Sequence, residues 1–159
     1  MLNIALVGLG GAGTMIVQRV MENGRIHALA SIYIINAENW LNNVRFYRFE
    51  QADDLIKELS KYKHVILTAG LGSSGGDSLV YLANRLNNVA AIFLTKPFRV
   101  EKERVKRAER QLVLLKGHVF TKDLNELLVR MADVPVGKAL DSFDRELAAE
   151  VIDKIMELS

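Results

Sequence analysis

Short apolar runs alternate along the chain with longer stretches in which apolar and polar residues recur at helical spacing. Runs of roughly four to eight aliphatic and β-branched residues that end at glycine or a polar residue are typical of strands buried on both faces. This pattern predicts strands over residues 2–7, 31–35, 64–70 and 89–94, a weaker edge strand over 45–49 and a brief strand over 118–120. Helices are predicted between them, over residues 15–21, 53–62, 78–86, 99–116, 123–131 and 138–158.

The last predicted helix has the clearest spacing. Its apolar residues follow three- and four-residue steps, which place them on one face that we expect to pack against the sheet. These residues are Leu140, Phe143, Leu147, Val151, Ile155 and Leu158.

The alternation of strands and helices predicts an α/β fold. We expect a doubly wound, Rossmann-like and mainly parallel sheet with helices on both faces and right-handed crossovers. The chain has 159 residues and shows no repeat or linker, so a single domain over residues 1–159 is expected. Ligands of such sheets bind beyond the carboxyl ends of the strands. The segments expected there are two glycine loops, 8–13 and 70–77, and the polar segments 36–38 and 95–98.

Two glycine loops that each follow a buried strand and precede a helix are typical of phosphate sites, because free backbone N–H groups gather there. Gly8, Gly10 and Gly13 also match the dinucleotide pattern, with Glu38 where a ribose-binding acid would stand. An NAD-binding oxidoreductase therefore remains an alternative function, although NAD binding would give the second glycine loop no role. A mononucleotide with its phosphates between the two loops accounts for both loops.

Composition argues against several classes of protein. The net charge of +2 is too small to indicate nucleic acid, and the absence of cysteine excludes disulfides and thiolate chemistry. No apolar run reaches the roughly 20 residues that span a bilayer. The N-terminus is typical of a strand and not of a signal peptide. We therefore expect a soluble, cytoplasmic protein that binds neither nucleic acid nor membrane.

One segment is strongly basic. Residues 96–116 include eight basic and three acidic residues, which suits either a solvated helix face or an anionic partner.

Four segments, taken in order, carry a family resemblance. Residues 7–13 read VGLGGAG, 35–38 read INAE, 65–72 read VILTAGLG and 95–98 read TKPF. Together with Glu101 and the LDSF sequence that ends at Phe143, they resemble the GTP-binding domain of the FtsZ/tubulin family over essentially the whole chain. The TKPF and TAGLG pieces are specific to the FtsZ-like branch. The resemblance implies a doubly wound parallel sheet followed by a long central helix.

The resemblance also implies a guanine-nucleotide site, with GTP or GDP as ligand and Mg²⁺ as a further candidate. It assigns the phosphate and base side to Gly10, Gly11 and Gly13, and the terminal phosphates to Gly70, Leu71, Gly72, Ser73, Ser74 and Gly75. Asn36 and Glu38 match the asparagine and aspartate after the second strand, Glu101 matches the ribose-binding glutamate, and Phe143 matches the aromatic residue that stacks on guanine.

Several departures from the family pattern modify this expectation. The second loop reads GSSGGD over residues 72–77, and the negative charge of Asp77 beside the phosphates is unfavourable unless Mg²⁺ or a helix N-terminus compensates it. Asp77 suits either an N-cap of the following helix or a role at the ligand. The guanine-reading positions on the last helix fall at Leu147 and Ala148, which cannot hydrogen-bond a base. The sequence also ends with that helix, without the family's second domain and its water-positioning acidic loop. We therefore expect at most weak GTPase activity.

Two functions from different classes follow from these observations. The first is a guanine-nucleotide-binding protein with little or no hydrolysis. The second is a non-enzymatic regulator with a degenerate pocket, which docks onto a full-length FtsZ/tubulin-like protein and caps its filament, or which associates with itself.

Overall fold

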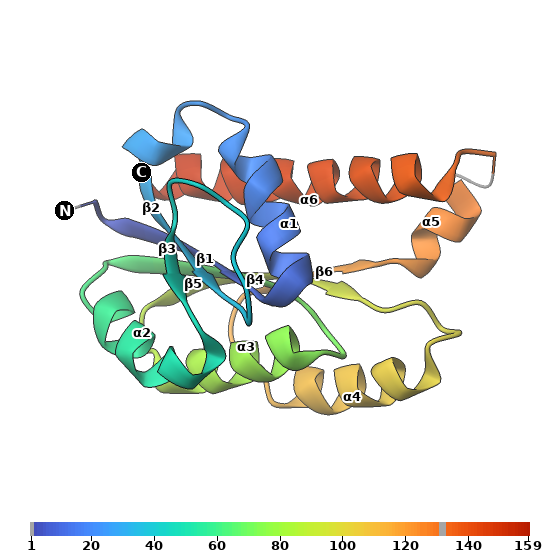
Figure 1. The fold of residues 1–159 in the computed structure, drawn as a ribbon, viewed down its shortest axis with the longest axis horizontal. Coiled ribbons are helices and arrows are strands. Elements are labelled where there is room, and N and C mark those ends of the chain that lie inside the picture. The colour runs from blue at the N-terminus through green and yellow to red at the C-terminus, as the bar shows by residue number, and fades with distance from the viewer. Residues whose placement is uncertain (1, 131–132) are drawn as a thin grey trace.

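The computed structural model describes residues 2–130 and 133–159, and Figure 1 shows one sheet with helices on both of its faces. Six parallel strands lie in the order β3-β2-β1-β4-β5-β6. The predicted α/β fold with a doubly wound parallel sheet is confirmed. The strands are β1 (Ile4–Leu9), β2 (Ala30–Ile35), β3 (Arg45–Tyr47), β4 (His64–Gly70), β5 (Val89–Lys96) and β6 (Val119–Asp123).

The helices alternate with the strands along the chain. They are α1 (Gly10–Met21), α2 (Ala52–Leu59), α3 (Ser74–Arg85), α4 (Lys102–Val113), α5 (Asn125–Arg130) and α6 (Val136–Leu158), with short 3₁₀ turns at Ile26–Ala28 and Phe49–Gln51. The prediction that a helix covers residues 123–131 is confirmed over Asn125–Arg130, and its last residue lies outside the described residues.

The two helices that follow the glycine loops begin earlier than predicted. α1 begins at Gly10 instead of residue 15, and α3 begins at Ser74 instead of residue 78. The prediction was wrong because it started each helix at the first apolar residue with helical spacing, whereas the glycines before it are already helical. The loops are therefore short, because residues 10–13 of the first predicted glycine loop and 74–77 of the second belong to helices.

Each face of the sheet has its own hydrophobic core. α1 and α6 cover one face, where Ile16, Val20, Leu147 and Val151 pack on the strands. α2, α3 and α4 cover the other face, as Figure 1 shows. The central strands β1 and β4 are apolar and almost completely buried, as expected for parallel strands between two helical layers.

The apolar stripe of α6 serves two separate cores. Leu147, Val151 and Ile155 are fully buried against the sheet, which confirms the predicted packing of this half of the helix. The first half of α6 extends past the strands to α5 (Figure 1), and there Phe143 packs with Leu127 in a small core of its own. A long helix can extend beyond a sheet in this way because its stripe continues to find apolar partners.

Membrane insertion of a helix has no support in residues 2–130 and 133–159. No helix described there combines the length and the apolar character needed to cross a bilayer.

Candidate functional site

The two glycine loops meet at the switch point of the sheet. β1 and β4 are neighbours in the sheet, and the helices that follow them, α1 and α3, lie on opposite faces. The approach is so close that a Cβ atom added to Gly10 would lie 2.8 Å from the Cα atom of Gly75. Crevices at such switch points are where open α/β sheets bind ligands. The predicted convergence of the two loops is therefore confirmed.

The N-terminus of α1 has unused hydrogen-bond donors. The first backbone N–H groups of a helix have no intrahelical acceptor. Leu9 stands at the N-cap and provides no side-chain acceptor, and no acidic residue lies in the first turn. Gly11 is exposed, and a Cβ atom added there would meet nothing within 4 Å. This end of α1 is therefore open to an anionic group.

The N-terminus of α3 lies opposite. Ser73 stands at its N-cap without a side-chain capping bond, and its hydroxyl donates instead to the carbonyl oxygen of Gly70 at 3.3 Å. Ser74 begins the helix and is exposed. The backbone N–H groups of this first turn add to those of α1, so two positive helix ends are aimed at one place.

The second loop is fastened to α4 by a buried glutamine that sequence reasoning missed. Gln111 accepts a hydrogen bond from the N–H of Gly72 at 2.7 Å, and its amide donates to the carbonyl oxygen of Ser73 at 3.0 Å and to Asp77 Oδ1 at 2.7 Å. Gln111 is only 4% exposed. One of the N–H groups expected to bind phosphate therefore already has an acceptor.

Asp77 is held from two sides. The guanidinium of Arg107 forms an ion pair with one carboxylate oxygen, and Gln111 donates to the other. The hydrogen bond from Arg107 is the main reason why the pKa of Asp77 lies below its ordinary value, while partial burial acts in the opposite direction. The predicted N-capping role is wrong, because Ser73 occupies the N-cap and Asp77 lies one turn into α3. Its negative charge is balanced within the protein and does not stand free beside the loop.

A groove on the α4 side of the loop is lined by arginines. Its volume is about 490 Å³, and its residues are Gly72, Ser73, Ser74, Glu103, Arg104, Arg107 and Arg110. The Arg104 guanidinium lies 3.5 Å from the carboxylate of Glu101, and Arg107 binds Asp77. Part of the positive charge predicted for this helix is therefore balanced by acids of the same chain.

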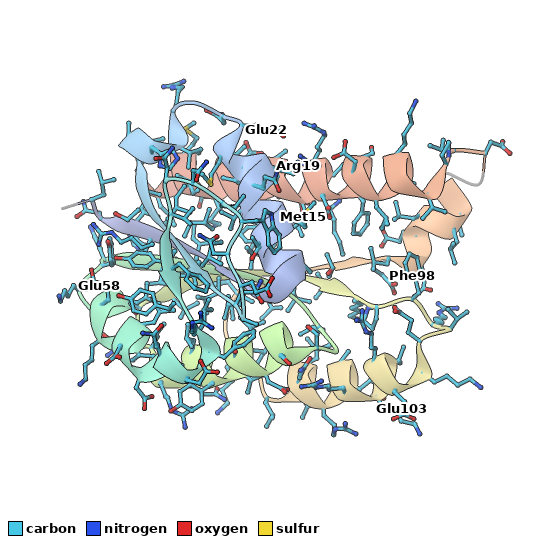
Figure 2. All side chains as sticks on the ribbon, viewed as in Figure 1. Met15, Arg19, Glu22, Glu58, Phe98 and Glu103 are labelled. Carbon is cyan, nitrogen blue, oxygen red and sulfur yellow. The ribbon has the colours of Figure 1, made fainter. Side chains whose placement is uncertain are left out.

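A pocket of about 360 Å³ lies between α1 and α6. Its lining combines apolar side chains with charged ones and comprises Ala12, Met15, Ile16, Arg19, Thr95, Leu124, Gly137, Leu140, Asp141 and Asp144. Met15, Arg19 and Glu22 are labelled along α1 in Figure 2. The pocket begins at Ala12, directly after the open Gly11, so it is continuous with the N-terminus of α1.

The charged groups beside this pocket form a network with one acid left over. Arg19 contacts Asp141 at 2.6 Å and Glu22 at 3.0 Å, and Arg145 contacts the same two carboxylates at 2.9 and 2.6 Å. Asp144 takes no part in these ion pairs. Burial raises the pKa of Asp144 to about 6, with a smaller upward contribution from Asp141 and an opposing one from Arg19.

Comparison with known proteins identifies a relative of this chain and a solved structure that shares its fold. No family model matches the chain. A protein of Archaeoglobus fulgidus that carries only the description "uncharacterized" is 36% identical over 171 aligned residues, which cover 99% of this chain and 96% of that protein. The two proteins belong to one family.

Among solved structures, CetZ from Methanosaeta thermophila strain DSM 6194 superposes with a TM-score of 0.76 over 100% of this chain and 55% of its own, at 16% identity. This chain therefore has a tubulin-like fold, and it spans about half the length of CetZ. A short chain dehydrogenase family protein from Francisella tularensis matches 96% of the chain and 90% of its own at 11% identity, with a TM-score of only 0.48.

In this tubulin-like fold, most of the predicted site residues lie at the carboxyl edge of the sheet. Gly10, Gly11, Gly72, Ser73, Ser74 and Gly75 surround the meeting point of α1 and α3. Of these, Gly11 and Ser74 are exposed and Ser73 is half-buried, whereas Gly10, Gly72 and Gly75 are buried, as are Gly13, Gly70 and Leu71 beneath them.

The ribose- and base-side predictions are more scattered. Asn36 and Glu38 follow β2, where the Asn36 side chain accepts a hydrogen bond from the N–H of Ala37 at 2.9 Å and Glu38 is exposed. Glu101 stands at the N-cap of α4, beside Arg104. Phe143 is 0% exposed inside the small α5–α6 core, so a base could stack on its ring only if that core opened.

Metal ligands are sparse. Among the described residues, no group of three or more histidine, cysteine or acidic side chains is placed to hold a metal ion. An Mg²⁺ ion at this site would therefore depend mainly on the oxygens of a bound phosphate.

Asp144→Asn is expected to stabilise the protein near neutral pH. The folded-state pKa of about 6 lies above the reference value of 3.8, so folding favours the protonated carboxyl. The Asp144 carboxyl therefore leaves the stability of the fold undiminished below about pH 4, and stability is lost as the pH rises through about 6 and the carboxyl ionises. At pH 7.5 the amide should therefore raise the free energy of unfolding by about 1–2 kcal/mol, after allowance for partial exposure.

Urea denaturation of both proteins at about pH 4 and about pH 7.5 measures this difference. It should be present at the higher pH and nearly absent at the lower. Asp153→Asn, an exposed site on the same helix, is the control for loss of one charge. Equal stabilities of Asp144→Asn and the natural protein at pH 7.5 would contradict the unpaired burial of Asp144.

Proposed function

We propose that this chain binds a guanine nucleotide, GTP or GDP, at the junction of α1 and α3. The observation that carries the proposal is the meeting of two helix N-termini, neither with a side-chain cap, at the switch point between β1 and β4. Paired helix ends of this kind favour a polyphosphate, because both the orphan N–H groups and the helix dipoles attract negative charge. The tubulin-like fold and the resemblance of the glycine loops to the FtsZ/tubulin family support the choice of nucleotide.

In this arrangement, the phosphates lie against Gly10 and Gly11 of α1 and against Ser73 and Ser74 of α3. The base extends past Ala12 into the pocket between α1 and α6, whose apolar walls suit a flat ring. Arg104 and Arg110, on the α4 side of the loop, add positive charge near the terminal phosphate. Mg²⁺ would neutralise the phosphates and be held chiefly by their oxygens.

We expect little or no hydrolysis from this site. Hydrolysis of a nucleotide needs a group that orients the attacking water. Asp77 lies in the first turn of α3, and its two carboxylate oxygens are engaged, one by Arg107 and the other by Gln111. That engagement keeps Asp77 from serving as the water-positioning group.

Gly11→Asp tests the phosphate site without disturbing the fold. A side chain at this position meets open space, and an acidic residue in the first turn of a helix is favourable by about 0.3–1 kcal/mol. The same carboxylate would repel a bound polyphosphate and weaken its binding by about 10-fold or more. Gly24→Asp is the matched control, because a Cβ atom there also meets nothing within 4 Å and the position lies away from the loops.

Calorimetric titration with GTP, GDP, ATP and NADH measures binding to the natural protein and to both variants. We expect heat from the guanine nucleotides, less from ATP and NADH, and a loss in Gly11→Asp alone. No heat from any nucleotide with the natural protein would reject the proposal. Equal nucleotide affinities of Gly11→Asp and Gly24→Asp would indicate that the phosphates do not bind at the N-terminus of α1.

A further inference from the structure

A small pocket lies between α4 and the edge of the sheet formed by β5 and β6. Its volume is about 180 Å³, and it shares no lining residue with the α1–α6 pocket or with the arginine groove. Four of its lining side chains are charged, two of each sign: Lys96, Arg99, Glu109 and Asp123. The proposed nucleotide site uses none of these four residues.

The charges of this pocket are not paired with one another. Lys96 and Asp123 are partners in the register of β5 and β6, and both line the pocket. Opposite charges at such close positions attract each other, yet no ion pair joins these two. In the described part of the chain, the side chains of Lys96, Arg99 and Glu109 make neither an ion pair nor a hydrogen bond. Charges of both signs therefore remain available to a molecule between them.

Asn125 holds the acidic side of the pocket in place. Asp123 Oδ1 accepts hydrogen bonds from the N–H of Asn125 at 2.9 Å and from its side-chain amide at 2.7 Å. The Asn125 side chain also accepts from the N–H of Arg99 at 3.0 Å and donates to the carbonyl oxygen of Pro97 at 3.4 Å. Asp123 is thereby fastened to the loop after β5. Its second oxygen has no hydrogen-bond partner among residues 2–130 and 133–159 and stays free to accept one.

The rest of the lining is apolar. Leu71 and Ala108 are buried, and Val105 and Leu112 are half-buried beside them. The volume of about 180 Å³ equals the liquid volume of about six water molecules. It is smaller than the pockets of about 300 Å³ or more that hold drug-sized ligands. The fitting ligand is therefore a small molecule with an apolar part and charges of both signs.

We propose that this pocket binds a free α-amino acid with a short apolar side chain, such as leucine. The ammonium group donates to the free oxygen of Asp123 and lies near Glu109, and the carboxylate accepts from Lys96 and Arg99. The side chain lies against the apolar lining. A simple anion would bring no positive charge to the two acids, and a simple amine would bring no negative charge to the two cations. The inference stands apart from the proposed function, because the two sites share no residue.

Two analogues of leucine test the need for both charges. 4-Methylpentanoate is leucine without its ammonium group, and 3-methylbutylamine is leucine without its carboxylate. Calorimetric titration of the natural protein extends to about 10 mM, because a ligand of this size binds with a Kd of up to about 1 mM. Leucine should bind, and each analogue should bind about 10-fold more weakly or not at all. No heat from leucine overturns the proposal, and equal binding of either analogue overturns the requirement for both charges.

Two substitutions test the residues. Asp123→Asn keeps an acceptor for Asn125 but loses the charge, and Lys96→Met keeps the apolar stem of the side chain. Each should weaken leucine binding by about 10-fold or more. Lys102→Met, on the exposed side of α4 and outside the pocket, is the matched control and should bind leucine like the natural protein. Thermal unfolding confirms that each variant is folded. Unchanged leucine affinity in folded Asp123→Asn and Lys96→Met would place the ligand elsewhere and overturn the inference.

Discussion

Substituting Gly13 with alanine should lower the free energy of unfolding by about 3 kcal/mol or more. A Cβ atom at this position would overlap the carbonyl oxygen of Thr68 in β4 and lie 3.2 Å from the carbonyl carbon of Gly8. Both neighbours are backbone atoms of central strands, which cannot move aside as a flexible side chain can. The close approach of α1 to β1 and β4 therefore requires glycine.

The direction of the stability change in Gly13→Ala distinguishes the effect of packing, which lowers stability, from that of helix propensity, which raises it. Alanine is favoured over glycine inside a helix by about 1 kcal/mol, so propensity alone predicts stabilisation. Gly11→Ala, in the same helix with open space around it, is the matched control and should be neutral or stabilising. Urea denaturation of both variants measures the difference. A stable Gly13→Ala protein would mean that α1 lies farther from the sheet than described.

Substituting Gln111 with leucine is expected to lower the free energy of unfolding by about 3 kcal/mol. Leucine matches the glutamine closely in volume but removes its hydrogen bonds to the N–H of Gly72, to the carbonyl oxygen of Ser73 and to Asp77. Two of these groups belong to the backbone of a tight loop, and Gly72 adopts a positive φ of 90° within it. The loop should consequently lose its fixed conformation as well.

Two measurements check the role of Gln111. Chemical denaturation gives the loss of stability, and amide hydrogen exchange should show faster exchange at Gly72 while the amides of β1 remain protected. Arg110→Ala, an exposed neighbour on α4, should change stability by less than about 0.5 kcal/mol. Unchanged exchange at Gly72 in Gln111→Leu would show that the loop is held by other contacts.

The strands were predictable from the sequence because each central strand is buried on both faces. β1 and β4 are apolar almost throughout, and no other element of this length gives such a run. The convergence of the glycine loops was predictable for a related reason, since the carboxyl ends of parallel strands share one edge. The starts of α1 and α3 were predicted too late, because glycine is common both in loops and in backbone conformations at helix ends and so does not mark where a helix begins.

The residues that define the candidate site were harder to find because their roles depend on distant contacts. Gln111 is separated from Gly72 by 39 positions, and in the sequence it is one polar residue in a charged helix. Asp144 lies next to Phe143 on α6, but whether it faces a pocket or solvent depends on where α1 crosses. For Phe143, the helical stripe correctly predicted burial, and its packing against α5 in place of the sheet reflects the length of α6.

The attachment of the second glycine loop to α4 also affects what a ligand would encounter. Fixing the backbone of one residue costs about 1–2 kcal/mol in conformational entropy. Gln111 and Arg107 already hold Gly72, Ser73 and Asp77, so this ordering accompanies the folding of the chain. An arriving phosphate would meet a surface that is already rigid, and its affinity would depend on the fit to that surface and not on the ability of the loop to close.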